Sequence, residues 1–514
     1  MKNMCRLLLL LAVLGFLSLH EMLAQTPATG QPVATAAPLA LSLPQAIDYA
    51  VKNKSTLQST RIDQELAAAR VGQVKSQGLP QVNVAATVTD NYKLQRSLVD
   101  FGAFAGGQGA LNGTTLTPAD VAAAQGGQSV TLRPAYDDPV PTPPTALSLG
   151  FQWQGNASAS ASQQLFNGSY LLGLKAAKVY QQLSVKQTKQ SEIDVVEQVS
   201  KAYYSTLVAG QRLELLSRNV ARLDTLLYQT QKTFEAGFAE KLDVQRLQVQ
   251  RNNLRIEQQN AERLIELSVA LLKFQMGLDQ RQPVQLTDSL STAVLDAERL
   301  KQSLAQADAN FNYQDRIEYS VLETQRDLAA LDVRNQKAGY LPTLNLIGAY
   351  GFLGSARSLP TLMEFRGTGS TDPTTGFPNQ NWFAFGNVGL QLQIPVFDGF
   401  RKKYQVQTAQ LTLKQVNTGF TTLQQSIDLQ RTQSQTTLQN DLDVLANQKA
   451  NLDLATEVAR VAKIKFQEGV GSNVELITAE TDLRQAQTNY YSALYDALVA
   501  KVDYDKASGT LYTK

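Results

Sequence analysis

The stretch Leu213–Leu247, LELLSRNVARLDTLLYQTQKTFEAGFAEKLDVQRL, decides the fold of this 514-residue chain. Its apolar residues recur every three and four positions, which is the heptad pattern of a coiled coil. The pattern stops at Phe234, meets a turn at Glu235-Ala236-Gly237, and gives way to a new heptad series that contains Leu247. The stretch therefore predicts two helices that run back along each other from a tight turn.

The same turn occurs a second time near the C-terminus, in KFQEGVGSNVEL over residues 465–476. Phe466 and Gly469 follow Phe234 and Gly237 at an offset of 232 residues. Repetition at a fixed offset indicates a duplicated structural unit. The sequence thus predicts two copies of one long helical hairpin.

The distribution of proline agrees with this prediction. No proline lies between Pro144 and Pro283 or after Pro395, and both hairpins fall in these two tracts. Proline in a helix interior costs about 3 kcal/mol, so long helices need such tracts. Phe166-Asn167-Gly168 and Phe397-Asp398-Gly399 mark the matching starts of the two long helices.

Alternating apolar and polar residues precede each long helix. This period of two predicts strands at about 81–92, 147–165, 343–353 and 382–397. The polar positions are uncharged and include Gln152, Gln154, Asn156, Asn387, Gln391 and Gln393. Such strands suit a transmembrane barrel with lipid outside and water inside. Since four strands cannot close a barrel, we expect several copies of the chain to share one.

Composition excludes several functional classes. The chain has 47 Lys and Arg against 45 Asp and Glu, so no charge excess indicates nucleic acid as a partner. Its one Cys and one His, Cys5 and His20, fall within a predicted signal peptide, where Lys2 and Arg6 precede the apolar run Leu7–Leu19. We therefore expect no Cys- or His-based catalysis, no metal site and no cofactor.

With the duplicated order of helix, two strands, long helix, turn and returning helix, the sequence resembles the TolC-like outer-membrane efflux protein family from residue 41 to about 510. The resemblance implies a mixed α and β fold, and a homotrimer whose twelve-stranded barrel lies in the lipid of the Gram-negative outer membrane and continues into a periplasmic helical tunnel. It further implies an export channel, not an enzyme, that works passively with a periplasmic adaptor and an inner-membrane pump in efflux or type I secretion. A periplasmic adaptor or a coiled-coil structural protein remains the alternative.

The predicted organisation has six parts. They are a signal peptide (1–24), a flexible leader (25–42), a first repeat (43–277, with its hairpin at 169–277), a linker or equatorial segment (278–305), a second repeat (306–510, with its hairpin at 400–508) and a tail (511–514), the stretches 93–146 and 353–381 being loops between strands.

Three groups of residues are candidate functional sites. Asp243, Glu475 and Thr478 lie just past the turns, where acidic residues of the family narrow the periplasmic mouth, so the resemblance implies a gate there. Gly237, Phe238, Gly469 and Gly471 form the turns and are candidate adaptor contacts. The uncharged polar strand residues named above are expected to face the barrel lumen.

Overall fold

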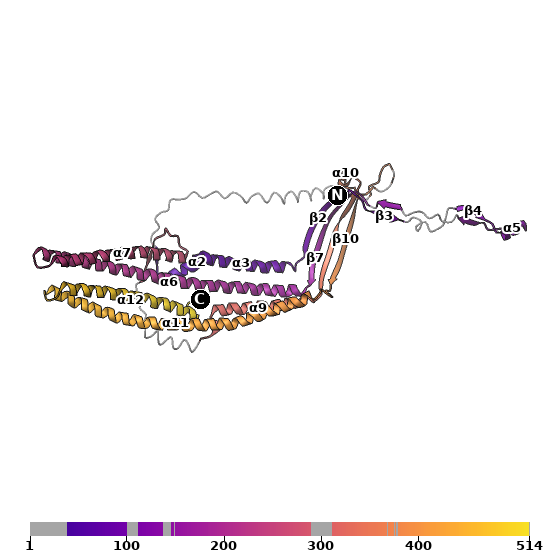
Figure 1. The fold of residues 1–514 in the computed structure, drawn as a ribbon. Coiled ribbons are helices and arrows are strands. Elements are labelled where there is room, and N and C mark those ends of the chain that lie inside the picture. Colours follow the sequence, from indigo (N-terminus) through magenta and orange to yellow (C-terminus); the bar gives the residue numbers. More distant parts are fainter. Residues whose placement is uncertain are drawn as a thin grey trace. The chain divides into compact units, whose positions relative to one another are not determined.

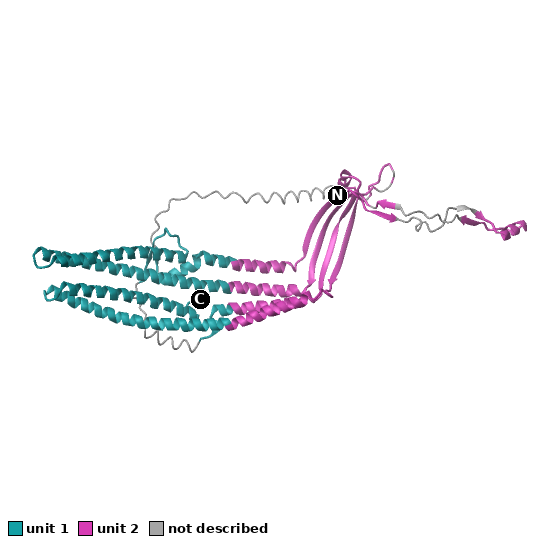
Figure 2. Ribbon diagram, in the orientation of Figure 1, with its two compact units in different colours: residues 1–62, 186–320, 422–514 teal, residues 63–185, 321–421 magenta. Residues whose placement is uncertain are grey.

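The computed structural model describes residues 39–99, 111–136, 145–148, 150–288, 311–366, 369–374, 376 and 379–512. The predicted signal peptide and most of the predicted leader and linker lie outside these residues. The chain divides into two compact units (Figure 2), one of residues 1–62, 186–320 and 422–514 and the other of residues 63–185 and 321–421.

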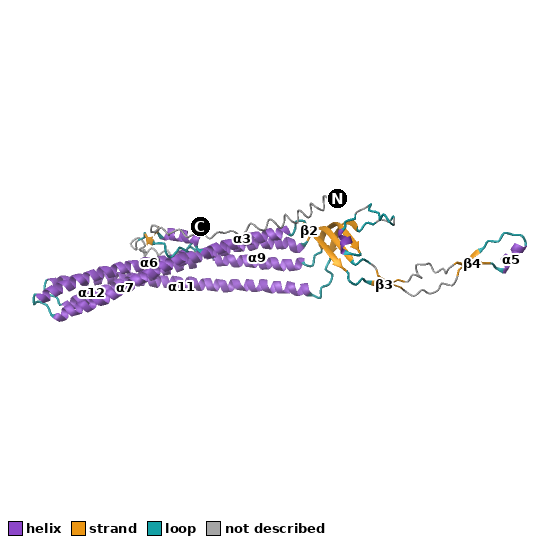
Figure 3. Ribbon diagram, turned by 90° about the horizontal axis from the view of Figure 1, so that it is seen from above, coloured by secondary structure: helices purple, strands orange, loops and turns teal. Residues whose placement is uncertain are grey.

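The described part of the chain contains helices of very different length (Figures 1 and 3). They are α2 (Leu43–Asn53), α3 (Ser55–Ser76), α5 (Pro118–Gln125), α6 (Gly168–Glu235), α7 (Lys241–Met276), the 3-10 helix η1 (Tyr313–Asp315), α9 (Ile317–Ala338), α10 (Leu359–Met363), α11 (Arg401–Gln467) and α12 (Asn473–Ser508). At 1.5 Å per residue, α6 and α11 are each about 100 Å long. None of the described helices combines the length and the apolar character needed to cross a bilayer.

Two hairpins, α6–α7 and α11–α12, form most of the first unit. In the first hairpin the heptad residues Leu216, Val220 and Leu223 of α6 are buried against Leu247 and Leu254 of α7. In the second, Leu438 and Leu442 pack on Ala500 and Tyr504, and Ala459 packs on Leu476 and Leu483. The seams thus bury the residues that carry the heptad pattern.

The first unit also contains a parallel ladder of two short strands. β1 (Leu39–Leu41) pairs with β8 (Val284–Leu286). Leu41 is buried, and its carbonyl oxygen accepts a hydrogen bond of 3.1 Å from the hydroxyl of Tyr203. The prediction of a flexible leader up to residue 42 is therefore wrong at its end, because these residues join the core. In the predicted tail, Leu511 and Tyr512 pack against the same core.

The second unit contains one antiparallel sheet of four strands. Its order is β10 (Trp382–Gln393), β9 (Thr343–Ala356), β7 (Trp153–Phe166) and β2 (Gln81–Asp90). β2 and β10 are the edge strands, and each has one side without a partner strand in the described chain. The sheet brings strands of both repeats together at the contact between β7 and β9.

The predicted strand 147–165 is in fact two strands. β6 (Thr145–Ser148) pairs with β3 (Arg96–Val99), whereas β7 begins only at Trp153. Gly150 lies between them with a φ of 117°, a conformation that ends an extended strand and that glycine tolerates.

The segment 93–146 is also more than a loop. It contains β4 (Leu111–Thr115) paired with β5 (Arg133–Tyr136), and α5 between them. The Thr117 side chain caps α5, and Asp120 completes the capping box. The second predicted loop likewise contains the short helix α10.

Candidate functional site

The turns of both hairpins have the same backbone structure. In the first, the N–H groups of Gly237 and Phe238 donate to the carbonyl oxygens of Phe234 and Thr233, each at 2.9 Å. In the second, Gly469 and Val470 make the equivalent bonds to Phe466 and Lys465 at 3.2 and 3.0 Å. This pattern is a Schellman motif, which needs a left-handed residue after the helix. Gly237 and Gly469 supply it with φ values of 79° and 74°.

Apolar side chains project from both turns. Phe238 is 86% exposed and Val470, at the equivalent position of the second repeat, is 80% exposed. Gly471 lies so close to the end of α11 that a Cβ atom there would be 3.0 Å from the carbonyl carbon of Lys465. Each turn therefore exposes one large apolar side chain to solvent directly after its left-handed glycine.

The predicted gate residues lie in the first turn of each returning helix or directly after it. Asp243 is half-buried, while Glu475 and Thr478 are exposed. Glu475 is not isolated, because its Oε1 atom is 3.2 Å from the Nζ atom of Lys465 on the other arm of the hairpin. Within one chain, the ammonium group of Lys465 therefore partly neutralises the carboxylate of Glu475.

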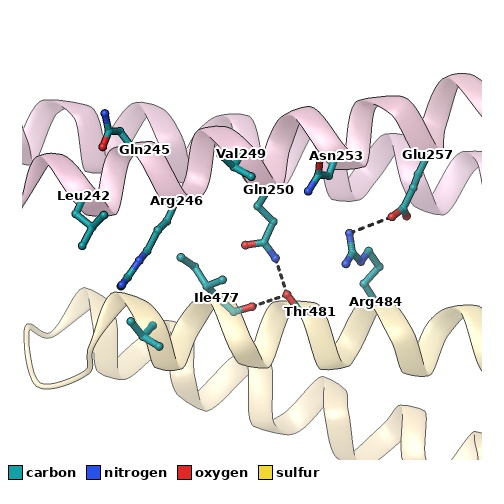
Figure 4. Close-up of a pocket in the computed structure, with 11 residues that line it drawn as sticks. Leu242, Gln245, Arg246, Val249, Gln250, Asn253, Glu257, Ile477, Thr481 and Arg484 are labelled. Atoms are coloured by element: carbon teal, nitrogen blue, oxygen red, sulfur yellow. Dashed lines mark hydrogen bonds and ion pairs between the residues drawn. The ribbon is translucent and has the colours of Figure 1, made fainter.

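A groove of about 630 Å³ separates the two hairpins near their turns. Figure 4 shows that α7 and α12 form its walls. The Nε2 atom of Gln250 donates to the hydroxyl of Thr481 across it, and Arg484 lies 3.7 Å from a carboxylate oxygen of Glu257. The groove thus has a mostly apolar lining, to which Leu242, Val249 and Ile477 contribute, and these two polar contacts join its walls.

A stronger contact between the hairpins lies between α6 and α12. Arg222 and Glu480 form an ion pair of 2.8 Å, and the Glu480 side chain is only 10% exposed. Burial raises the pKa of this carboxyl, and the charges of Arg222 and Lys463 oppose that effect. Glu480 is therefore not part of a solvated helix face, since it pairs with Arg222 of α6. Only the position of α6, far away in sequence, identifies this residue.

The strand register places the predicted lumen residues of β7 and β10 on one face of the sheet. We define this polar face by residues that share strand parity in the observed pairing: Asn83, Gln154, Asn156, Ser158, Ser160, Asn387, Gln391 and Gln393. Gln152 is an exception to the prediction. It precedes β7, and its Nε2 atom donates to Oδ1 of Asp90 at 3.1 Å. It is therefore a residue of the strand end and not of the face.

The opposite face is apolar. We define the apolar face by Val82, Val84, Val88, Leu344, Leu346, Val388, Leu390 and Leu392, which also share parity in the pairing. Most of these side chains are exposed. At one end of the face the Trp382 ring stacks on Phe365, and its Nε1 atom donates to the carbonyl oxygen of Leu362 at 2.9 Å.

Large apolar side chains also lie on the polar face. Phe383 and Phe385 of β10 and Ile347 and Leu353 of β9 have the parity of the polar residues and not that of Trp382. The aromatic residues at this end of β10 therefore do not share one face, because neighbouring residues of a strand point to opposite faces.

Known outer membrane efflux proteins are similar to this chain in sequence. The family model for outer membrane efflux proteins matches residues 145–278 and 320–510. Outer membrane protein TolC of Vibrio cholerae is 21% identical over 360 residues, covering 69% of this chain and 77% of TolC.

Solved structures share the fold. A membrane protein from Pseudomonas aeruginosa has a TM-score of 0.63 at 17% identity, covering 95% of this chain and 99% of that chain. The open state of the MtrE outer membrane channel of Neisseria gonorrhoeae has a TM-score of 0.62 at 15% identity, covering 95% and 96%. The predicted mixed α and β fold with long helices is confirmed. Since the family model matches more than half of the chain, including both hairpins and three of the four sheet strands, the chain belongs to the outer membrane efflux protein family, the TolC-like transport proteins of the outer membrane.

Proposed function

We propose that three copies of this chain form an export channel whose sheets close into one twelve-stranded barrel. The observation that carries the proposal is the sheet of the second unit, with its exposed apolar face, its uncharged polar face and its two unpaired edges. In a bilayer each unpaired backbone group costs several kcal/mol, so β2 of one copy must pair with β10 of the next. The apolar face would then contact lipid, and the polar face would line water.

The two hairpins are proposed to extend this channel into the periplasm. There the exposed side chains Phe238 and Val470, with the glycines beside them, would bind a periplasmic adaptor that links the channel to an inner-membrane pump. The polar face offers uncharged side chains and no acid or base pair, which supports a passive conduit rather than an enzyme. The sheet and both hairpins together also disfavour a periplasmic adaptor or a purely structural coiled coil.

Experiments on the purified protein test the proposed channel directly. We expect a heat-sensitive trimer on unheated denaturing gels and ohmic single-channel conductance in planar bilayers of neutral lipid. A monomer that produces no conductance at any protein concentration would contradict the proposal.

The gate is proposed to consist of Asp243, Glu475 and Thr478 around the channel axis. Three Glu475 carboxylates in a narrow opening would attract divalent cations, so Glu475→Ala should weaken block of the conductance by divalent cations about tenfold or more, the effect of roughly 1.4 kcal/mol. Single-channel recording with increasing Mg²⁺ measures it.

Lys465 provides the matched test of this gate. Its ammonium group partly neutralises Glu475, so Lys465→Gln should strengthen the same block. Equal block in all three proteins would show that Glu475 is only a solvated residue of the first helical turn.

A further inference from the structure

The junction between β10 and α11 carries a surface patch that the channel proposal does not use. We define the junction patch as Val396, Phe397, Phe400, Arg401, Lys403 and Tyr404, all within the second unit. Val396 is 91% exposed and Phe397 is 76% exposed. Phe400 and Tyr404 are exposed as well. These apolar side chains are too exposed to belong to a protein core, and they lie directly beside the basic residues Arg401 and Lys403.

The backbone holds the aromatic part of the patch in place. Gly399 and Phe400 are consecutive left-handed residues, with φ values of 66° and 67°. A bulky residue rarely adopts this conformation. Here it brings the Phe400 ring edge-to-face against Phe397, with 5.6 Å between the ring centres. The equivalent junction of the first repeat has Ser169 in place of Phe400 and no basic residues directly after it, so the patch is specific to the second repeat.

Two of the three consecutive cations of the junction are available to a ligand. Lys402 is not, because its side chain is 14% exposed, lies 3.5 Å from the carboxylate of Asp398 and is stacked over the Tyr340 ring. That ion pair cancels the charge of Asp398. Arg401 makes no side-chain hydrogen bond or ion pair with any residue that the structure describes. The ammonium group of Lys403 lies over the rings of Phe400 and Tyr404, at 5.8 and 6.0 Å from the ring centres.

Tyr404 connects these two cations. Its ring lies beneath Lys403, and it lines the same groove as Arg401. This groove has a volume of about 410 Å³ and runs between α9 and α11. Its other walls are formed by uncharged polar side chains and Asp332, including Gln336, Gln405 and Thr408. A ligand here meets the guanidinium of Arg401, the carboxylate of Asp332 and uncharged hydrogen-bonding side chains.

We propose that the junction patch binds an anionic phospholipid with a hydroxylated headgroup. The phosphate would lie between Arg401 and Lys403, the headgroup hydroxyls would enter the polar groove, and the acyl chains would contact Val396, Phe397 and Phe400. The inference rests on the proposed function, because the sheet must lie in a bilayer to bring the patch to its surface. Charge complementarity selects an anionic lipid, and the exposed apolar half selects a lipid over a free anion.

Binding of phosphatidylglycerol and phosphatidylcholine to the purified full-length protein in detergent tests the proposal. Each basic side chain at an anionic lipid surface contributes roughly fivefold in affinity, so the double variant Arg401→Gln/Lys403→Gln should bind phosphatidylglycerol about 30-fold more weakly. Its affinity for phosphatidylcholine should not change. Native mass spectrometry with increasing lipid measures both affinities.

The matched control is Lys414→Gln/Lys449→Gln, which removes the same charge from exposed positions of α11 and should bind phosphatidylglycerol like the wild type. Phe397→Ser should weaken the binding of both lipids. The proposal is overturned if the wild type binds the two lipids equally, or if inorganic phosphate displaces phosphatidylglycerol, which would indicate a site for a free anion. It is also overturned if a second copy of the chain covers the patch, so that Phe397→Ser splits the trimer and leaves lipid binding unchanged.

Conductance in neutral bilayers separates this inference from the proposed function. The Arg401→Gln/Lys403→Gln variant should conduct there like the wild type. Conductance without any preference for phosphatidylglycerol would refute the lipid site alone, whereas the absence of conductance in the wild type would refute the channel.

Discussion

Arg316→Ala is expected to lower the free energy of unfolding by about 3–5 kcal/mol, which is the cost of removing one partner from a buried ion pair. The Arg316 side chain is 5% exposed. Its guanidinium donates two hydrogen bonds of 3.0 Å to the carboxylate of Glu318, one of 2.8 Å to the carbonyl oxygen of Ala507 and one of 3.2 Å to Gln430. One side chain thus ties the start of α9 to the end of α12 and to α11. Urea unfolding followed by circular dichroism measures the loss.

Arg218 offers a matched control. It also pairs with a glutamate, Glu214, but its side chain is 74% exposed on the surface of α6. Exposed pairs contribute about 0–1 kcal/mol, so Arg218→Ala should leave the unfolding midpoint nearly unchanged. Equal midpoints for the two variants would show that burial of Arg316 contributes nothing. The double variant Arg316→Met/Glu318→Met should recover much of the loss, since it leaves no unpaired buried charge.

The pH dependence follows from Glu318. Burial alone would raise the pKa of this carboxyl, but the hydrogen bonds and charge of Arg316 outweigh burial and hold the pKa below its ordinary value. A depressed pKa contributes stability above the unfolded pKa, about 4.3, and loses it as the pH falls through the folded pKa. The difference in the free energy of unfolding between the wild type and Arg316→Ala should therefore become smaller as the pH falls below the unfolded pKa of Glu318.

The helices of the two hairpins and the turns between them could be predicted from the sequence. Leu216, Val220 and Leu247 carry a heptad pattern because each packs on the other helix of the same hairpin. The turn at Gly237 has a local cause too, since a Schellman motif needs a left-handed residue at that point. Structural features that depend on residues only a few positions apart can therefore be predicted from the sequence.

Contacts between elements that lie far apart in the sequence could not be predicted in this way. Arg222 and Glu480 form a buried ion pair across two hairpins, and neither residue interrupts its own helical pattern. The faces of the sheet show the same limit, because the parity of Phe383 depends on its register with Leu353 on β9. Two short helices had local signals that were missed: the capping box of Thr117 and Asp120 at α5, and the N-cap Ser358 followed by Pro360 at α10.

The second large effect is expected at the hairpin turns. The double variant Gly237→Val/Gly469→Val should reduce export at least tenfold while trimers still reach the outer membrane. A left-handed valine costs roughly 1–2 kcal/mol at each turn, too little to unfold long packed hairpins. A Cβ atom at either glycine meets nothing within 4 Å, so the change is confined to the exposed surface beside Phe238 and Val470. Cargo release from cells and unheated gels of outer membranes measure the two quantities.

Gly277 and Gly509 separate docking from folding because they end α7 and α12 with the same motif and with φ values of 70° and 82°. Their surroundings differ, since a Cβ atom would lie 2.9 Å from Cα of Lys54 at Gly277 and 2.8 Å from the carbonyl oxygen of Asp315 at Gly509. Gly277→Ala/Gly509→Ala should therefore lose trimers. Phe238→Ser/Val470→Ser leaves the backbone of the turns unchanged and should still lose adaptor binding. If the valine variant also loses trimers, the turns serve folding, and if it exports normally, the adaptor binds elsewhere.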